Sequence, residues 1–357
     1  MAAPDVANKR HAGSDAAASV LRAARSVVRV LASLALTFLG LTAITFFIGR
    51  VMPIDPVLAI VGDRAHQDVY DAMYLQLGLD KPLYIQYFTY LGDILTGDFG
   101  TSIQTSRPVI DDLLRFFPAT LELATLGTLV GVVLGIPMGV FAAVNQGRMI
   151  DHVVRVVGLI GYSVPVFWLG MVALLIFYAK LQWVPGPGRL DIYYDGLVPT
   201  VTGMLLIDST IAGNWTVFEN ALSHLLLPTA ILGTFALAYI ARMTRSFMLD
   251  QIRQEYILTA RVKGLGEGKV IWRHAFGNVL VQLVTIIGLT YASLLEGSVL
   301  TETVFSWPGI GQYITNALFN SDMNAVIGGT IVVGTCFVGI NMFSDLLYRL
   351  VDPRTRT

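Results

Sequence analysis

The segment with the most obvious chemical pattern is EYILTARVKGLGEGKVIWRHA, residues 255–275, which is basic and holds three glycines within five residues. A glycine-rich loop ending in lysine is typical of a phosphate-binding P-loop, whose backbone amides hold the phosphates and whose Ser or Thr hydroxyl holds Mg²⁺. That pattern needs glycine five residues before Gly268 and a hydroxyl residue after Lys269. The chain has Lys263 and Val270 there instead. The segment is therefore not an ATP site.

No other segment supplies a catalytic or metal-binding pattern. The five histidines are scattered without metal-ligand spacing, and the chain has no G-x-S-x-G motif. The single cysteine, Cys336, lies in an apolar run, which excludes an intramolecular disulfide and favours a packing role. We therefore predict no catalytic residue, no metal ligand and no cofactor bound by this chain.

The composition predicts a membrane protein. Hydrophobic residues make up 54% of the chain and charged residues only 14%, against about 25% in soluble domains. A run of about 20 apolar residues is long enough to cross the hydrocarbon core of a bilayer as a helix. The runs that meet this condition are 30–49, 118–143, 156–180, 224–246, 279–301 and 324–348. The sequence thus predicts an all-α membrane protein with six transmembrane helices.

The distribution of basic residues predicts how these helices are oriented. With the amino terminus inside, seventeen of the 24 Lys and Arg residues fall in cytoplasmic segments, and nine acidic residues fall in the outer loop 51–117. Cytoplasmic loops are enriched in Lys and Arg. Both termini and the segment 255–275 are therefore predicted to be cytoplasmic.

Interpreted as helices, the segment 255–275 is physically reasonable. A first helix fits Glu255 to Lys263, because acidic and basic residues lie at the ends that the helix dipole favours. Gly264 fits a left-handed helix stop, and a second helix can begin near Lys269. A short basic amphipathic helix below the membrane either lies on anionic lipid as a structural element or docks in a groove of a partner. The pattern alone leaves both open.

The same segment resembles the cytoplasmic EAA loop of binding-protein-dependent ABC transporter permeases of the dipeptide/oligopeptide (peptide/nickel) family. That family shows D/E-Y-x-x-T-A-R-A-K-G-L followed by R-H-A-x-x-N, and this chain has Glu255-Tyr256, TARVKGL (259–265) and RHA (273–275) with Asn278. Further matches follow in order: LGLDKP (78–83), GDFGTS (97–102), RPV (107–109), FPATLELA (117–124), HLLLP (224–228), ARMTRS (241–246), ETVFSWPGIGQ (302–312) and DLLYRLVDPR (345–354). Gln282 departs from the family, where proline is frequent, which puts a local kink in doubt.

The resemblance implies a type I ABC importer permease in a bacterial inner membrane. Its implied partners are a second homologous permease, two ATPase subunits that bind ATP and Mg²⁺, a substrate-binding protein and membrane lipid, with no nucleic acid. Hydrolysis would occur on the separate ATPases, so the chain itself is not an enzyme. The cargo would be di- or oligopeptides, although related systems carry nickel, glutathione or sugars. The implied ATPase-coupling residues are Glu255, Tyr256, Thr259, Ala260, Arg261, Lys263, Gly264 and Leu265.

The sequence and the resemblance together predict how the chain is organised. The predicted parts are a disordered cytoplasmic tail (1–28), a first transmembrane helix with a periplasmic loop (29–117), a permease core (118–350) containing the coupling loop (247–275), and a short cytoplasmic tail (351–357).

Four glycines in the second predicted span recur every four residues: Gly127, Gly131, Gly135 and Gly139. This spacing forms a smooth stripe on one helix face, which lets another helix approach closely. The stripe predicts helix packing, as a static interface or a sliding one, and the adjacent Pro137 predicts a bend.

Three acidic residues in or near the spans are expensive in lipid and need an explanation. Glu122, near an outer end, either reaches the headgroups or pairs locally. Glu296 lies deeper and is a candidate for a polar translocation path, where it would suit cationic or amino-terminal substrate groups, or for a pair with a basic residue. Glu302 is a second candidate for the path, although a structural role at the turn formed by Pro308 and Gly309 is favoured.

The outer loop carries four aromatic residues in YIQYFTYLGDILTGDFG, at Tyr84, Tyr87, Phe88 and Tyr90. They favour an interfacial amphipathic helix, and the acidity of the loop also suits docking of a binding protein. A proton-coupled secondary transporter is the alternative function, because six spans and an intramembrane glutamate fit it. It would leave the basic helix at 255–263 without a role.

Overall fold

The computed structural model describes residues 28, 32–49, 55–62 and 64–351. Within these residues the chain is helical, and the strand-like pairing consists of one isolated bridge between Thr101 and Pro108. The predicted tails lie outside the described residues except at their inner ends, Val28 and Val351, so the disorder predicted for 1–28 is not tested.

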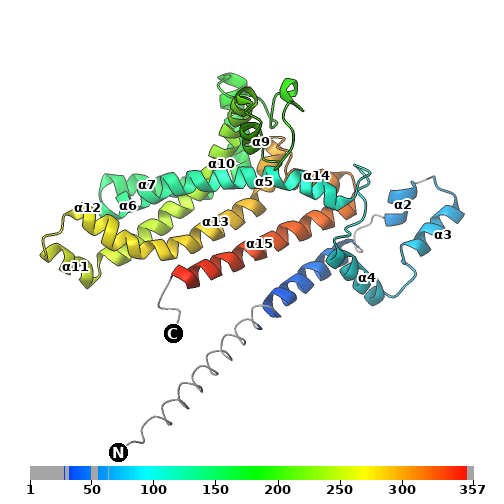
Figure 1. The fold of residues 1–357 in the computed structure, drawn as a ribbon, viewed down its shortest axis with the longest axis horizontal. Coiled ribbons are helices and arrows are strands. Elements are labelled where there is room, and N and C mark those ends of the chain that lie inside the picture. Colours follow the sequence, from blue (N-terminus) through cyan, green and yellow to red (C-terminus); the bar gives the residue numbers. More distant parts are fainter. Residues whose placement is uncertain (1–27, 29–31, 50–54, 63, 352–357) are drawn as a thin grey trace, which may run out of the picture.

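Five helical runs in the described part of the chain are long and apolar enough to cross a membrane, and a sixth candidate is bent. The five are Ala32–Gly49; α5 (Val109–Val130) with η1 (Gly131–Gly135) and α6 (Ile136–Val144); α10 (Trp215–Ile252); α12 (Glu267–Lys269) with η4 (Val270–Ala275) and α13 (Phe276–Val304); and α15 (Met323–Val351). Figure 1 shows these long helices packed lengthwise. The all-α fold and five of the six predicted spans are confirmed.

The third span differs from the prediction. A single helix was expected over 156–180, but the chain forms α7 (Met149–Ser163), then α8 (Val166–Ala173) and η2 (Leu174–Lys180), with a bend of 97° between them. Pro165 lies at the break and lacks a backbone N–H, and the residue before a proline avoids the helical conformation. Val164 is accordingly extended.

The second span begins earlier than predicted, at Val109 rather than at residue 118. Pro118 therefore lies inside α5, and the predicted boundary between 117 and 118 falls within this helix. The apolarity of the sequence decreases before Pro118, but Asp111 and Asp112 occupy the first turn, where the helix dipole favours negative charge. Near Pro137 the backbone forms the π-helical turn η1, a common way for a helix to accommodate a missing N–H.

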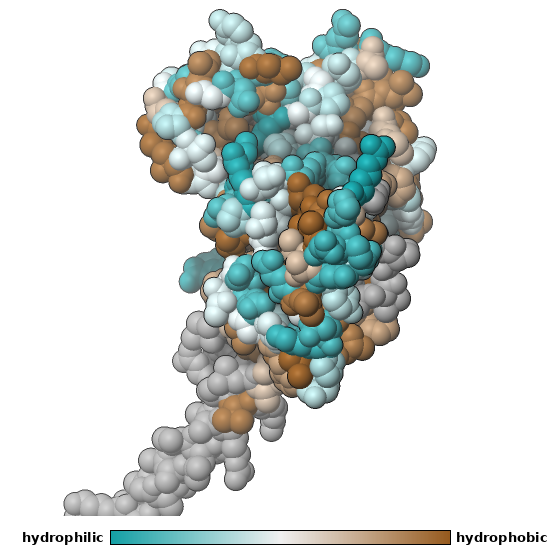
Figure 2. Space-filling view, turned by 90° about the vertical axis from the view of Figure 1, so that its right-hand side faces the viewer, coloured by the Kyte–Doolittle hydropathy of each residue, from teal (hydrophilic) through white to brown (hydrophobic). Residues whose placement is uncertain are grey.

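The remaining described helices are short: α2 (Pro56–Val61), α3 (Gln67–Gln76), α4 (Leu83–Thr96), η3 (Ile192–Tyr194), α9 (Leu205–Ile211), α11 (Glu255–Val262) and α14 (Ile310–Phe319). In Figure 1, α11, α12 and the turn between α6 and α7 lie at one end of the bundle, and α14 and α2–α4 lie at the other. Figure 2 faces the second end, where hydrophilic residues cover much of the middle and hydrophobic residues lie beside them. The bundle thus separates the coupling loop from the predicted outer loop 51–117, while the loop that contains α9 projects from its side.

The glycine stripe of the second span lies against α10. A Cβ atom on Gly131 would be 2.5 Å from the Cβ of Ala236, and one on Gly139 would be 2.6 Å from the carbonyl oxygen of Ala241. Gly127 is less crowded, with 3.3 Å to the Cβ of Leu232. The structure therefore places these glycines where two helix backbones approach too closely for a side chain.

Candidate functional site

The coupling loop contains the predicted helix, stop and second helix. Helix α11 begins at Glu255 and ends at Val262, with Lys263 at its carboxyl end. Gly264 follows with φ of +79°, the left-handed conformation that ends many helices, and α12 begins at Glu267. The structure confirms this local prediction. It could be made from the sequence because it depended only on neighbouring residues.

One face of α11 packs inside the chain. Ile257 is fully buried and Ala260 is 7% exposed, and both contact a core cluster that includes Val140, Met248 and Val270. Leu265 packs against the same cluster. In this structure Ala260 and Leu265 pack toward the bundle and hold α11 to it, and their contact with an ATPase remains a prediction.

The opposite face of α11 is exposed and partly apolar. Leu258 is 63% exposed and Val262 is 80% exposed, and residues four apart lie on the same side of a helix. Glu255, Thr259 and Lys263 are exposed as well. The two apolar residues were missed in the sequence, although the helical period that places Ile257 and Ala260 inward would have indicated them.

Two polar contacts brace the loop. Arg261 donates two hydrogen bonds to the carboxylate of Glu267, at 2.8 and 3.1 Å, across the turn at Gly264. The Tyr256 hydroxyl accepts a hydrogen bond from the side chain of Asn278, at 2.9 Å. Tyr256 and Arg261, both predicted to contact a partner, therefore also hold α11 against the next helix.

Helix α13 carries exposed polar side chains on one face, with the exposed Leu289 and Leu300 among them. Its exposed polar side chains recur at helical spacing, namely Asn278, Gln282, Ser293, Glu296 and Thr303. Glu296 makes no ion pair within the described part of the chain. Such a face is unfavourable against lipid, so it must border water or another protein chain.

Glu302, the second residue predicted for the path, is fully buried and does not border a path. Its carboxylate accepts hydrogen bonds from the Thr120 hydroxyl at 2.7 Å, from the Ser298 hydroxyl at 3.0 Å and from the backbone N–H of Gln312 at 3.1 Å. These groups come from α5, α13 and the first turn of α14. In this structure the carboxylate joins three helices next to the turn at Pro308, which supports the structural interpretation rather than the path.

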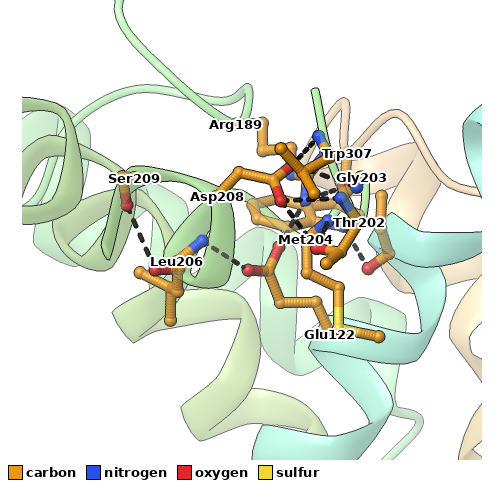
Figure 3. A network of polar contacts seen from close by, with 11 residues as sticks. Glu122, Arg189, Thr202, Gly203, Met204, Leu206, Asp208, Ser209 and Trp307 are labelled. Carbon is orange, nitrogen blue, oxygen red and sulfur yellow. Dashed lines mark hydrogen bonds and ion pairs between the residues drawn. The ribbon is translucent and has the colours of Figure 1, made fainter. Parts of the chain in front are cut away.

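Glu122 is held by a local pair, as one of the two interpretations expected. Its carboxylate lies 2.5 Å from an Nη of Arg189 and accepts a hydrogen bond from the backbone N–H of Leu206 at 2.8 Å (Figure 3). Arg189 also donates to the carbonyl of Gly203 and lies over the ring of Trp307. These contacts tie the outer loop between η2 and α10 to the bundle. No sequence pattern indicated Arg189, which is 67 residues from its partner.

A second carboxylate organises the same loop. Asp208, in α9, accepts hydrogen bonds from the amides of Thr202 at 2.8 Å and Gly203 at 3.0 Å, and from the Thr202 hydroxyl at 2.7 Å (Figure 3). Burial raises the pKa of Asp208, but these hydrogen bonds together outweigh it and lower the pKa below its usual value. The carboxylate therefore stays ionised and fixes the turn before α9.

The described residues contain no group of three or more His, Cys, Asp or Glu side chains placed to hold a metal ion. The polar clusters described above are thus sites of helix packing, loop attachment and polar helix surface. None of these described clusters combines a nucleophile with a base.

Family models match most of the chain. Residues 135–357 match the model described as binding-protein-dependent transport system inner membrane component, and residues 23–124 match its N-terminal counterpart.

Several relatives match almost their whole length. A probable D,D-dipeptide transport system permease protein, DdpB, from Escherichia coli strain K12 is 45% identical over 90% of this chain and 94% of its own. The di/tripeptide permease DppB of Pseudomonas aeruginosa is 43% identical over 92% and 98%, and the dipeptide permease DppB of Escherichia coli strain K12 is 41% identical over 90% and 95%.

A solved structure shows the same fold. The MetNI methionine ABC transporter in an inward-facing conformation contains a chain that matches with a TM-score of 0.50 and 19% identity, over 67% of this chain and 96% of that one. The family models, the relatives and the packed apolar helices lead to one conclusion. The chain belongs to the inner membrane components of binding-protein-dependent transport systems and is a multi-pass permease subunit of an ABC importer in a bacterial inner membrane.

Proposed function

We propose that this permease moves di- or oligopeptides that a separate substrate-binding protein delivers, and that ATP is hydrolysed on two separate ATPase subunits. The observation that carries the proposal is the near full-length identity of 41–45% to permeases whose names specify dipeptides. The missing P-loop agrees with ATP and Mg²⁺ being bound by partner chains. We further propose a second, homologous permease in the complex, with both termini and the coupling loop in the cytoplasm.

The test is reconstitution of the complete complex in vesicles with a labelled dipeptide, its binding protein and ATP. Uptake is expected to require ATP and to continue when the proton gradient is collapsed. Uptake that stops on collapse of the gradient at constant ATP would instead support a proton-coupled carrier.

Within this function, α11 is proposed to seat in a cleft of the ATPase and to transmit its closure to the bundle. The exposed pair Leu258 and Val262 would supply the apolar contact, and Lys263 and Glu255 would supply charged contacts at the two ends. The buried pair Ile257 and Ala260 would pass the movement into the core cluster around Met248. A helix fixed on one face and apolar on the other fits docking into a groove.

The Val262→Asp variant tests this role. Val262 touches little of its own chain, since 80% of it is exposed, so the substitution should leave the permease folded. Placing a charge in an apolar cleft should lower ATPase association and transport at least about tenfold, the equivalent of about 1.4 kcal/mol. The measurement is co-purification of the ATPases together with peptide uptake.

The matched control is Ile192→Asp, in η3 between η2 and α10, where the replaced isoleucine is 94% exposed and lies outside the candidate spans and the coupling loop. If Val262→Asp keeps normal ATPase binding and uptake, the exposed face of α11 is not the coupling surface.

The polar face of α13 is proposed to line the translocation path, facing the second permease. Glu296 would place a negative charge beside the amino-terminal ammonium of a passing peptide. Changing Glu296 to Gln keeps the shape but removes this charge, so uptake of a free dipeptide should fall several-fold while uptake of its N-acetylated form, where transported, is unaffected. Rates for both cargoes, measured in the same vesicles, check this expectation. An equal loss for both forms would show that Glu296 acts only structurally.

A further inference from the structure

The end of the bundle opposite the coupling loop holds a cavity of about 390 Å³, within the size range of small-ligand sites. Phe46 and Gly49, from the last turn of the first span, form one wall, and Asn324, from the first turn of α15, belongs to another. The turn between α3 and α4, and α4 itself, complete it. Because two membrane-spanning helices end here, the cavity lies where hydrocarbon gives way to water.

The packing of α4 shows how deep this part of the protein reaches. The hydroxyls of Tyr90 and Thr45 are 3.0 Å apart, and so are those of Tyr87 and Thr42. Thr45 and Thr42 precede the end of the span at Gly49 by about one and two helical turns, roughly 6 and 10 Å along the axis. Helix α4 therefore lies beside the span, at the level of the membrane boundary and below it.

The outer face of α4 is apolar and uncovered in the described structure. Tyr84 is 65% exposed, Phe88 is 66% exposed and Leu95 is 70% exposed, and their spacing places them on one side of the helix. At this depth such a face suits contact with lipid acyl chains. The cavity thus opens beside a surface that fits the apolar part of a lipid.

The polar side chains of the cavity include charges of both signs, Lys81 against Asp93 and Asp98. Lys81 and Asp93 make no ion pair with any described residue. Asp98 accepts one hydrogen bond, from the amide of Gly100. The side-chain amide of Gln86 donates to the backbone carbonyl of Lys81 at 2.7 Å, but its Oε1 is buried and accepts no hydrogen bond. The cavity therefore offers the ammonium of Lys81, the exposed carboxylates of Asp93 and Asp98, and one buried acceptor without a partner, the Oε1 of Gln86.

We propose that this cavity binds the headgroup of a zwitterionic phospholipid that carries a primary ammonium group, as phosphatidylethanolamine does. Lys81 binds the phosphate, and the ammonium donates to Asp93 and to the Oε1 of Gln86. A choline headgroup has no N–H to donate, and a glycerol headgroup has no cation to offer to the two carboxylates. The acyl chains then follow the face formed by Tyr84 and Phe88. This inference needs only the membrane location and is independent of the substrate.

The experiment places the purified complex in nanodiscs with equal amounts of phosphatidylethanolamine, phosphatidylcholine and phosphatidylglycerol. After extraction into detergent, the lipids that stay bound are counted by native mass spectrometry. The ethanolamine lipid is expected to be enriched on the unmodified protein. The Asp93→Asn and Lys81→Gln variants should retain roughly tenfold less of it. Asp68→Asn, on the exposed surface of α3 and outside the cavity lining, should retain as much as the unmodified protein.

Three results would overturn the proposal. The unmodified protein could retain the three lipids equally, a result that requires no variant to fold. Asp68→Asn could lose as much lipid as Asp93→Asn. Finally, a free dipeptide, which shares the zwitterionic chemistry, could displace the bound lipid in competition, and the occupant of the cavity would then be a soluble zwitterion.

Discussion

Replacing Glu302 with alanine is expected to destabilise the permease by about 3–5 kcal/mol, because several hydrogen bonds to one buried carboxylate are lost together. The Thr120 and Ser298 hydroxyls and the Gln312 amide would keep their positions but lose their acceptor. The melting temperature of the purified complex in nanodiscs should fall clearly, and the yield of folded protein should fall with it.

The Glu302→Gln variant separates shape from hydrogen bonding at this position. The amide has nearly the shape of the carboxylate, but its NH₂ group must face N–H or O–H donors that surround the site. The melting temperature of Glu302→Gln is expected to lie between those of Glu302→Ala and the unmodified protein. Glu219→Gln, at an exposed position of α10, serves as the control and should change little. If Glu302→Ala has the same melting temperature as the unmodified protein, the carboxylate does not hold the three helices together.

Adding one methyl group at Gly131 or Gly139 is expected to have an effect of similar size. The new Cβ of Gly139→Ala would lie 2.6 Å from the carbonyl oxygen of Ala241 and from the Cβ of Thr244, so the backbones of α6 and α10 would have to separate. Overpacking of this kind costs about 1–3 kcal/mol, and more where backbone must move. Gly127→Ala, with 3.3 Å to the nearest atom, should cost less. The melting temperatures of Gly131→Ala and Gly139→Ala should therefore lie below that of Gly127→Ala.

Gly297→Ala on α13 is the matched control for the glycine series. A methyl group added to this helical glycine would have no atom within 4 Å, so alanine should be neutral or stabilising by up to about 1 kcal/mol. If Gly131→Ala and Gly139→Ala are as stable as Gly297→Ala, the stripe is not a close helix interface. Stable variants with reduced uptake would instead indicate that this interface slides during transport.

The local features of the chain were predictable because they depend on neighbouring residues. Apolar runs long enough to cross a bilayer indicated the five unbroken spans, and the left-handed stop at Gly264 followed from its position after a helix-forming segment. The absence of a P-loop could likewise be predicted, because that motif is defined by the spacing of its residues along the sequence. The ends of the spans were less predictable. Helix α5 extends to Val109 although its first turn is charged, and the chain bends between α7 and α8 at Pro165 although both helices are apolar.

The three acidic residues show what the sequence alone does not determine. Glu122, Glu296 and Glu302 all lie in apolar surroundings along the chain, yet one pairs with Arg189, one is exposed on a polar helix face, and one is buried among hydroxyl and amide donors. The partners of Glu302 include Thr120, which is 182 residues away.

The same distinction applies to the coupling loop. The sequence determined that α11 is a short basic helix with a glycine stop, because hydrogen bonding and helix dipoles act over a few residues. The tertiary structure decided that Ile257 and Ala260 face inward and that Leu258 and Val262 face outward. It did so because the inward face is the one that can fill the space beside Met248 and Val140. Packing between distant segments, which no local pattern encodes, assigns each side chain its role.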